Sequence, residues 1–431
     1  MGKVSTLRVV PKDRAPQLPD LTDEVRLALS EAAVSAREGL LAMSVATGLT
    51  VMHAMMQAEI TGLAGPKGKH DAARTVVRHG TAPSSVTLGA RRVPVDRPRA
   101  RAGGEEVALE SFAAFAGDDP LTAVVLERML AGLACRRFSA GQEPVGERVE
   151  ASARSTSRSA VSRRFVKATE TALAELLARD LSDLPVAAMM VDGLHIAEHL
   201  MVVALAITTD GTKVPVGLYE GDTENTTVVT GCLADLVDRG LNTSGGVLFV
   251  LDGAKALTKA VHKVFGATAL IQRCTLHKRR NVADHLPDRE RKLVDRQLVR
   301  AFTHPDPDLG LRAARELATA LERPHPSAAA SVREGLEEMF TVRRLGLSAG
   351  LERTLTTTNP VESMISIARS TQRNVKRWQD ASMARRWTAA GMNVAEAKFR
   401  RIKGYREMPL LVAALARHVD SRQSETVGAP A

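Results

Sequence analysis

The order of apolar segments between residues 186 and 272 limits the fold of this chain more than any other feature. Short apolar runs at residues 186–191, 199–208 and 214–219 have the length and composition of β-strands. The turn pair Asp210-Gly211 joins the second run to the third. The sequence therefore predicts three consecutive strands, with a hairpin between the second and the third.

Helices and strands alternate after this hairpin. The four segments that follow are a helix at residues 223–240, a buried strand at residues 247–251, a helix at residues 254–265 and a strand at residues 267–272. The predicted order is therefore βββαβαβ. This order opens a ribonuclease H-like mixed sheet, so the predicted fold class is α/β.

Two aspartates stand at the ends of strands in this order. Asp192 directly follows the first strand and Asp252 directly follows the fourth, and a glycine comes after each. In this topology the two strands are parallel neighbours, so both carboxylates would meet at one end of the sheet. Such carboxylates can hold two divalent cations that assist an in-line phosphoryl displacement. Asp-Gly after a strand is also a common turn, but two at neighbouring strand ends favour a metal site.

Glu362 is the best third carboxylate. It lies in the phrase Thr-Thr-Thr-Asn-Pro-Val-Glu-Ser at residues 356–363. This phrase also predicts a capping box, with Asn359 as N-cap, Pro360 at the first helical position and Glu362 at the third. The two roles are compatible, because a glutamate in a first helical turn can turn outward to a metal. Glu352 is the neighbouring candidate if Glu362 is only a cap.

Several motifs in a fixed order carry a family resemblance. They are VDGLHIAEH, GDTENTTVVTGCLADLVDRGL, LFVLDGAKALTKAV, QRCTLHKRRNVADHLP and TTTNPVESMISIARSTQRNVKRWQDASMARRW. Together they resemble the bacterial mutator-type transposases of insertion sequences, strongly over residues 189–401 and more loosely at residues 132–138 and 157–165. The resemblance implies that Asp192, Asp252 and Glu362 are the catalytic acids, and that they hold Mg²⁺, with Mn²⁺ able to substitute.

The same resemblance assigns the long interval between Asp252 and Glu362. Strand signals end after Cys274, and residues 278–340 are charged and helix-like, with proline-containing loops at residues 304–307 and 324–326. This stretch resembles the all-α insertion of such transposases. Cys274 and His277 match the family's Cys-x-x-His motif. No second Cys/His pair follows, so we expect no structural zinc and a supporting role beside the active site, with His277 a candidate DNA contact.

The charge balance points to a polyanionic partner. The chain has 59 Lys plus Arg against 49 Asp plus Glu, a net charge of +10, and only 3% aromatic residues. A basic protein with few aromatic residues suits the backbone of duplex DNA better than stacked single-stranded bases. We therefore expect double-stranded DNA as the partner, both terminal inverted repeats and target, bound by a homodimer or higher homo-oligomer.

The N-terminal third predicts a helical and helix-turn-helix DNA-binding region. Residues 21–63 have helical spacing, the basic residues 67–101 follow, and extended runs at residues 86–95 and 106–112 predict a two-stranded ribbon around Gly103-Gly104. Helices are predicted at residues 119–134 and 157–178.

Residues 145–173 have the pattern of a helix-turn-helix, with Ser157 or Ser159 as the N-cap of a helix that carries Arg163, Arg164 and Lys167. We expect these three cations to contact DNA. An ordinary amphipathic surface helix with solvated charges is the alternative interpretation.

A second set of cations surrounds the candidate site. Arg279 and Arg280 follow His277, and we expect both to contact DNA. Beyond Glu362, four cations stand at helical spacing on the face that Glu362 begins: Arg369, Arg373, Lys376 and Arg377. We expect these to hold phosphates near the metals. A solvated face is the alternative, although such a face usually mixes both signs.

These interpretations divide the chain into six segments. They are an N-terminal helical region (1–85), a DNA-binding region (86–180), the first part of the core (181–272), the insertion (273–344), the second part of the core (345–403) and a tail (404–431).

The predicted function is a DNA transposase that cleaves and transfers strands. The alternatives are a ribonuclease H-like nuclease or junction resolvase, and a domesticated DNA-binding repressor.

The expected cellular location follows from the cysteine count, the first residues and the longest apolar stretch. The chain has three cysteines, which imply no disulfide framework, and its first residues carry no apolar signal core. The longest apolar stretch, residues 186–207, contains Asp192 and Glu198 and is therefore not a membrane span. We expect a bacterial cytoplasmic protein that associates with the nucleoid when it binds DNA.

Overall fold

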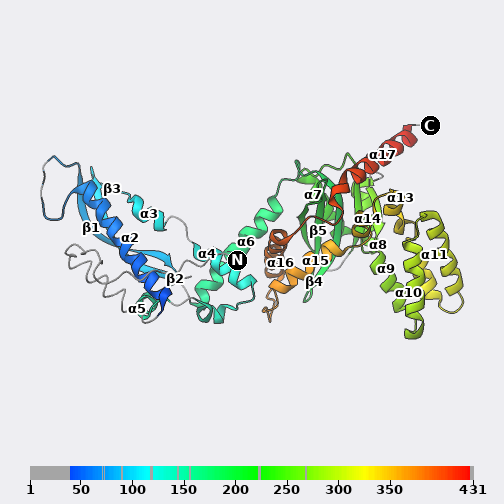
Figure 1. Cartoon of the computed structure of the whole chain (residues 1–431), viewed down its shortest axis with the longest axis horizontal. Helices are drawn as coiled ribbons and strands as arrows, with labels where there is room; N and C mark the ends of the chain where they lie inside the picture. Colours follow the sequence, from blue (N-terminus) through cyan, green and yellow to red (C-terminus); the bar gives the residue numbers. More distant parts are fainter. Residues whose placement is uncertain are drawn as a thin grey trace, which may run out of the picture. The chain divides into compact units, whose positions relative to one another are not determined.

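The fold is known from a computed structural model (Figure 1). It describes residues 39–427 except for 70, 72, 89–90, 117–119, 143–144, 155–156, 222–224 and 267–268. The chain divides into two compact units: the first runs to Glu127 and resumes over Leu133–Arg164, and the second contains Arg128–Gly132 and everything from Phe165 onward. The second unit carries the candidate active site.

The first unit contains a small antiparallel sheet packed on a long helix. Its elements are α2 (Leu40–Ala64), β1 (Val76–Leu88), β2 (Arg91–Ala102), β3 (Glu105–Val107) and α3 (Glu110–Ala116). The strand order is β1-β2-β3. A common core contains Met52 and Met56 of α2, Val86, Val93 and Leu109.

The predicted ribbon is present, but its strands have other bounds than the sequence predicts. Val86 of β1 pairs with Val93 of β2, so residues 86–95 belong to two strands of a hairpin instead of one. Strand-forming residues continue across the boundary between β1 and β2, so residues 86–95 read as one extended run in the sequence. The turn at Gly103-Gly104, with positive φ at both glycines, does join two strands as predicted. Residues 110–112, predicted as strand, begin α3 instead.

Helices connect this sheet to the second unit along the chain. They are α4 (Pro120–Leu130), the 3-10 turns η2 (Cys135–Arg137) and η3 (Ser139–Gly141), α5 (Glu147–Ser152) and α6 (Arg158–Ala178). The Ser157 hydroxyl accepts a hydrogen bond from the amide of Ala160 (3.3 Å), which matches its predicted role as N-cap. The first helix of the predicted helix-turn-helix at residues 145–173 is α5, which has only six residues and is short for such a motif. The helix-turn-helix interpretation therefore remains a prediction.

A five-stranded mixed sheet forms the centre of the second unit. Its strands are β4 (Val186–Ile196), β5 (His199–Thr208), β6 (Lys213–Gly221), β7 (Val247–Leu251) and β8 (Ala269–Arg273), in the order β6-β5-β4-β7-β8. The first three strands pair antiparallel, whereas β4, β7 and β8 are parallel. With α7 (Thr226–Asp238) and α8 (Lys255–Phe265), the predicted order βββαβαβ is confirmed.

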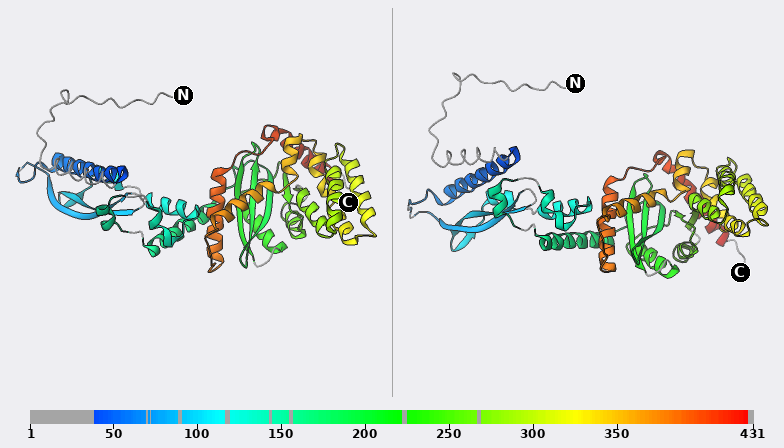
Figure 2. Two further views of the ribbon diagram at one scale, coloured as in Figure 1. Left: turned by 60° about the horizontal axis from the view of Figure 1, so that its bottom comes forward. Right: turned by 90° about the horizontal axis from the view of Figure 1, so that it is seen from below.

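Helices cover both faces of this sheet (Figure 2). Alternate strand residues point to opposite sides, so Met189 and Val191 pack with α7 and α8, while Met190 and Leu194 pack on the other face. The helices on that second face are α6, α14 (Ala349–Leu355), α15 (Asn359–Thr371), α16 (Ala381–Lys398) and α17 (Met408–Val427), the last preceded by the 3-10 turn η6 (Tyr405–Glu407). Two hydrophobic layers therefore fix the sheet between helices.

The segment between β8 and α14 is helical, as predicted. It contains α9 (Thr275–Asp284), α10 (Asp288–Phe302), α11 (Pro307–Leu321), α12 (Pro326–Arg333), the 3-10 turn η5 (Glu337–Met339) and α13 (Thr341–Arg344). Pro307 and Pro326 each stand in the first turn of a helix, where a missing amide hydrogen costs nothing. A separate hydrophobic core runs from Val282 to Phe340.

No helix among the described residues is long and apolar enough to cross a membrane.

Candidate active site

Asp192 and Asp252 lie where the neighbouring parallel strands β4 and β7 adjoin. Val191 of β4 is in register with Leu251, the last residue of β7, and the residue after each of them is one of the two acids. The sequence predicts that Asp192 directly follows its strand. In the structure Asp192 lies within β4, because this strand continues to Ile196 by pairing with β5. Oδ1 of Asp192 accepts the amide hydrogen of Gly193 (2.8 Å), and Oδ1 of Asp252 accepts that of Ala254 (2.8 Å). These bonds orient both carboxylates.

Glu362 stands in the first turn of α15, but it does not form the predicted capping box. The helix begins at Asn359, so the N-cap is Thr358. The amide of Thr358 donates to Sγ of Cys274 (3.4 Å), which leaves no N-cap amide hydrogen for Glu362. Oε1 of Glu362 instead accepts the hydroxyl hydrogen of Thr358 (2.7 Å). Glu362 is therefore held toward Cys274 and His277.

Electrostatic coupling joins the three acids. Burial, followed by the negative charge of Asp252 and, more weakly, that of Glu362, raises the pKa of Asp192 to about 7. A hydrogen bond with Cys274, together with the charges of Asp252 and Glu362, raises the pKa of His277 to about 9. The charges of Asp252 and Glu362 contribute to both pKa shifts, so these two carboxylates lie close enough to Asp192 and His277 to interact with them electrostatically. The cluster is thus a concentration of negative charge with one cationic imidazole beside it.

Cys274 and His277 begin the helix next to these acids. Cys274 is fully buried, and its amide donates to the carbonyl of Leu251 (2.7 Å), one residue before Asp252. Burial raises the pKa of its thiol, but hydrogen bonds with His277 and Thr358 outweigh burial and lower the pKa overall. Nδ1 of His277 lies 3.8 Å from Oε1 of Glu362. The structure places the Cys-x-x-His pair against the third acid.

The donor set fits a hard divalent cation at the aspartates. Carboxylate oxygens are the ligands that Mg²⁺ prefers, and a cation would offset both the burial of Asp192 and its repulsion by Asp252, which together raise its pKa. Among the described residues, the atoms of Cys274, His277 and Glu362 also lie within 4.8 Å of one another. Sulfur and nitrogen donors would suit zinc better than magnesium. The hydroxyl of Thr358, however, contacts all three of these side chains.

The cations that the sequence assigned to DNA differ in their surroundings. Arg279 makes a two-point ion pair with Asp295 of α10 (2.6 and 2.7 Å), so it joins α9 to α10, whereas Arg280 is exposed. On α6, Arg163 and Lys167 are exposed, and Arg164 donates to the hydroxyl of Thr122 (3.0 Å).

The four cations beyond Glu362 do not share a helical face. Helix α15 ends at Thr371, so of the four only Arg369 is helical, and that part of the prediction is wrong. The chain leaves the helix to pack Trp378 against Trp387 of α16, with ring centroids 6.4 Å apart. Arg373 donates to the carbonyl of Ala131. Lys376 and Arg377 lie exposed in the loop that follows.

The basic stretch of the first unit is largely engaged within the protein. Arg97 and Arg99 both pair with Glu106, and Arg91 is buried beside Glu150. Arg78 donates to the carbonyl of Gly65 (2.9 Å). These cations stabilise the hairpin and its connections, so the exposed cations of α6 are better placed for an external partner.

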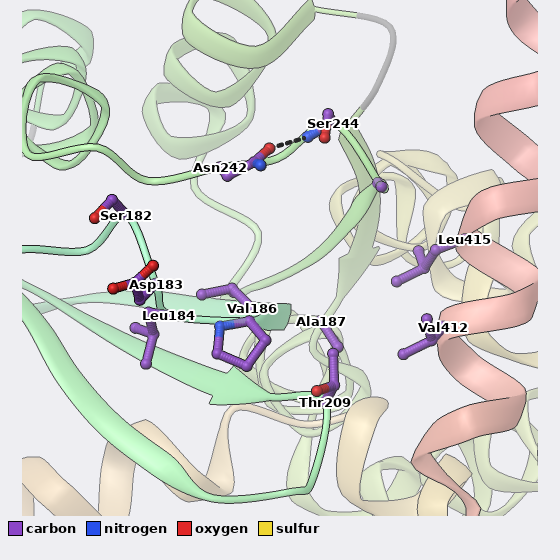
Figure 3. Close-up of a pocket in the computed structure, with 13 residues that line it drawn as sticks. Ser182, Asp183, Leu184, Val186, Ala187, Thr209, Asn242, Ser244, Val412 and Leu415 are labelled. Carbon is purple, nitrogen blue, oxygen red and sulfur yellow. Dashed lines mark hydrogen bonds between the residues drawn. The ribbon is translucent and has the colours of Figure 1, made fainter.

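A pocket of about 310 Å³ opens at the other end of the sheet (Figure 3). It lies at the start of β4, around Val186 and Ala187, and Val412 and Leu415 of α17 point into it. Its acidic lining residue is Asp183, and none of the three candidate acids lines it. The pocket is therefore separate from the candidate active site.

The chain also matches a model of a known family. A family model described as "Transposase, Mutator family" matches residues 19–401. The chain belongs to the Mutator family of transposases. The matched range includes the three acids, Cys274 and His277.

Individual relatives of this Mutator-family chain carry transposase names. It is 28% identical over 185 residues to a probable transposase for an insertion sequence element of Corynebacterium diphtheriae, which covers 42% of this chain and 52% of that protein. It is also 28% identical over 173 residues to the transposase for insertion sequence element ISRM3 of Rhizobium meliloti, covering 40% of this chain and 42% of that protein. The match thus spans about half of these relatives' length or less.

Thr358 is the residue at this site that the sequence did not reveal as important. It precedes Glu362 by four residues, so one helical turn brings their side chains together. This spacing was the available signal. Its meaning depends on Cys274 and His277, which are about eighty residues earlier in the chain and contact Thr358 only in the folded protein.

Proposed function

We propose that this chain is the transposase of an insertion sequence and that it catalyses metal-dependent cleavage and transfer of DNA strands at the element's terminal inverted repeats. The observation that carries the proposal is the pairing of Asp192 and Asp252 on neighbouring parallel strands, coupled in charge to Glu362, in a Mutator-family chain. The insertion-sequence names of the relatives support the same function.

The sheet supports a ribonuclease H-like interpretation of the core. Three antiparallel strands continue into parallel β7 and β8, and the two aspartates lie where β4 and β7 adjoin. The helical segment with its own core, placed between the second aspartate and the glutamate, is the proposed insertion. Such a core presents carboxylates on rigid strands, which favours the precise geometry that phosphoryl transfer needs.

Each side chain has a defined part in the proposed reaction. Bound Mg²⁺ or Mn²⁺ would polarise the scissile phosphate and lower the pKa of the attacking group, which is water in cleavage and the 3′-hydroxyl in transfer. Asp192, Asp252 and Glu362 would hold the ions, and they need not form a covalent link to DNA. His277, with its raised pKa, carries a positive charge at neutral pH and can face a phosphate oxygen.

The two steps differ in the attacking group. Cleavage hydrolyses a phosphodiester at the transposon end, and transfer joins the freed 3′-hydroxyl to a second strand. Purified full chain incubated with a labelled repeat end, target plasmid and Mg²⁺ should yield both nicked end and joined product. Hydrolysis without joining would favour the nuclease interpretation over the transposase.

The affinity of the chain for Mg²⁺ is expected to fall about tenfold per pH unit below pH 7, because a proton on Asp192 competes with the ion. Above pH 7 this carboxylate is ionised, so affinity should level off. Because the folded pKa is raised, the same group stabilises the metal-free fold at low pH, and this contribution is lost as pH rises through 7. Calorimetric titrations across this range measure the effect, and a flat profile would contradict it.

DNA binding is proposed to use the exposed cations of α6. Replacing Arg163 and Lys167 together by alanine should weaken binding of repeat DNA and reduce the slope of log affinity against log salt by about 2, one unit per lost phosphate contact. Fluorescence anisotropy of the full chain at several salt concentrations measures both quantities.

The matched control for this variant removes two exposed cations elsewhere. Arg312 and Arg323 of the insertion, replaced together by alanine, change the net charge by the same amount. If both double variants lower the slope equally, net charge explains the effect and α6 has no specific part in binding.

A further inference from the structure

The hydroxyl of Thr358 lies at the centre of the cluster beside the third acid. Its Oγ1 is 2.7 Å from Oε1 of Glu362, 3.2 Å from Nδ1 of His277 and 3.3 Å from Sγ of Cys274. Thr358 itself is fully buried. One oxygen therefore touches the carboxylate proposed to bind metal and both members of the Cys-x-x-His pair.

These contacts belong to a larger connection between the starts of α9 and α15. The amide and hydroxyl of Thr275 both donate to the carbonyl of Thr356 (3.0 and 3.1 Å), and the amide of Thr358 donates to Sγ of Cys274. The amide of Cys274 in turn donates to Leu251, next to Asp252. A continuous set of hydrogen bonds thus runs from the end of β7 to the first turn of α15.

We propose that Thr358 is a positioning residue, whose hydroxyl fixes the direction of the Glu362 carboxylate and transmits the orientation set by Cys274 and His277. The inference rests on the proposed function, because it concerns how the third acid meets the metal. The Cys-x-x-His pair then acts on catalysis indirectly, through this hydroxyl.

The hydrogen atoms available match this arrangement. A threonine hydroxyl has one hydrogen and two lone pairs. The hydrogen goes to Oε1 of Glu362, its shortest contact, and a hydrogen on Nδ1 of His277 goes to a lone pair of Oγ1. Sγ of Cys274 accepts the amide hydrogen of Thr358. This assignment uses the single hydrogen and one lone pair of the Thr358 hydroxyl, and the fixed direction of the hydroxyl limits rotation of the Glu362 carboxylate.

The same position of Oγ1 argues against a zinc ion held by Cys274, His277 and Glu362. A tetrahedral zinc ion would lie about 2.0–2.3 Å from each donor, between the three atoms that Oγ1 now contacts. The hydroxyl and such an ion compete for one place. Zinc binding at these three side chains is therefore an outcome that would contradict the proposed role of Thr358.

The test compares Thr358→Val, which replaces the hydroxyl by a methyl group of similar size, with Thr358→Ser, which keeps the hydroxyl. We expect Thr358→Val to weaken Mn²⁺ binding to the metal-free full chain by about 10–100-fold, as loss of a group that orients a metal ligand does. Thr358→Ser should stay within about threefold of the unsubstituted chain. Binding is read by the spin-resonance signal of free Mn²⁺, and urea unfolding checks the fold.

Thr357 provides a matched control. Its hydroxyl is buried and has no hydrogen-bond partner among the described residues, and it adjoins Thr358 in the chain. Thr357→Val should leave Mn²⁺ affinity unchanged. A loss of affinity in Thr357→Val as large as in Thr358→Val would show a general effect of substitution near α15 and would overturn the proposal.

Other outcomes are equally decisive. Normal Mn²⁺ affinity in a folded Thr358→Val protein overturns the positioning role but leaves the proposed function intact, provided that Asp252→Asn still lacks cleavage. An equal loss of Mn²⁺ affinity in Thr358→Ser and Thr358→Val also overturns the positioning role of Thr358. Stoichiometric zinc binding that Cys274→Ser abolishes would identify a metal site in place of the hydroxyl-centred cluster. Absence of Mn²⁺ binding in the unsubstituted chain would overturn both proposals.

Discussion

Replacing Asp192 or Asp252 by asparagine, or Glu362 by glutamine, is expected to reduce single-turnover DNA cleavage by at least about a thousandfold, or about 4 kcal/mol in activation free energy. Each amide keeps the size of the side chain but removes the charge that holds a divalent cation. Binding of repeat DNA should stay close to normal, because the acids would contact metal ions and not bases. Gel assays of cleavage and binding on the same preparations separate the two effects.

Two other acids serve as controls for this result. Asp183 lies at the opposite end of the same sheet, in the pocket of Figure 3, so Asp183→Asn should cleave normally. Glu352, the alternative third acid, is largely buried and pairs with Arg343 at 2.7 Å. Glu352→Gln should therefore affect stability more than chemistry. If Glu362→Gln cleaves normally while Glu352→Gln does not, the assignment of the third acid is wrong.

Trp387→Ala is expected to lower the free energy of unfolding of the second unit by about 3–5 kcal/mol, the usual cost of removing a buried aromatic side chain. Trp387 is 6% exposed and packs against Phe165 of α6, with ring centroids 4.6 Å apart, and against Trp378. Its loss would leave a cavity among α6, α16 and the segment after α15. Urea unfolding followed by circular dichroism measures the change.

Trp387→Phe is the conservative comparison. It retains an aromatic ring for Phe165 and should lose less stability than Trp387→Ala. It also leaves Trp378 as the only tryptophan of the chain, so fluorescence then reports on the segment after α15 alone. An alanine variant as stable as the unsubstituted chain would contradict the packing argument for why α15 ends at Thr371.

The order of strands and helices in the core could be predicted because each buried strand is a short apolar run bounded by turn residues. β5 and β7 begin and end at the residues expected from the pattern. The pattern failed where neighbouring strands decide the outcome. β4 extends past Val191 because β5 continues to pair with it, and residues 86–95, which read as one extended run, belong to the two paired strands β1 and β2.

The site could be predicted in part for the same reason. Asp192 and Asp252 follow apolar runs, and the parallel pairing of β4 with β7 brings them together. The role of Glu362 could not be separated from helix capping, because capping is a local property and metal binding is not. Arg369 to Arg377 show the reverse error: their helical spacing is real in the sequence, but packing of Trp378 on Trp387 ends the helix first.

The sequence by itself determined the family, the order of elements in the second unit and the helical character of residues 278–340, since these depend on residue type and spacing along the chain. Only the tertiary structure decided which cations are engaged within the protein, where α15 ends and what surrounds Glu362. The physical reason is that hydrogen bonds and burial depend on distance in space. Thr358 contacts Cys274 across more than eighty residues of chain, and no local pattern records that contact.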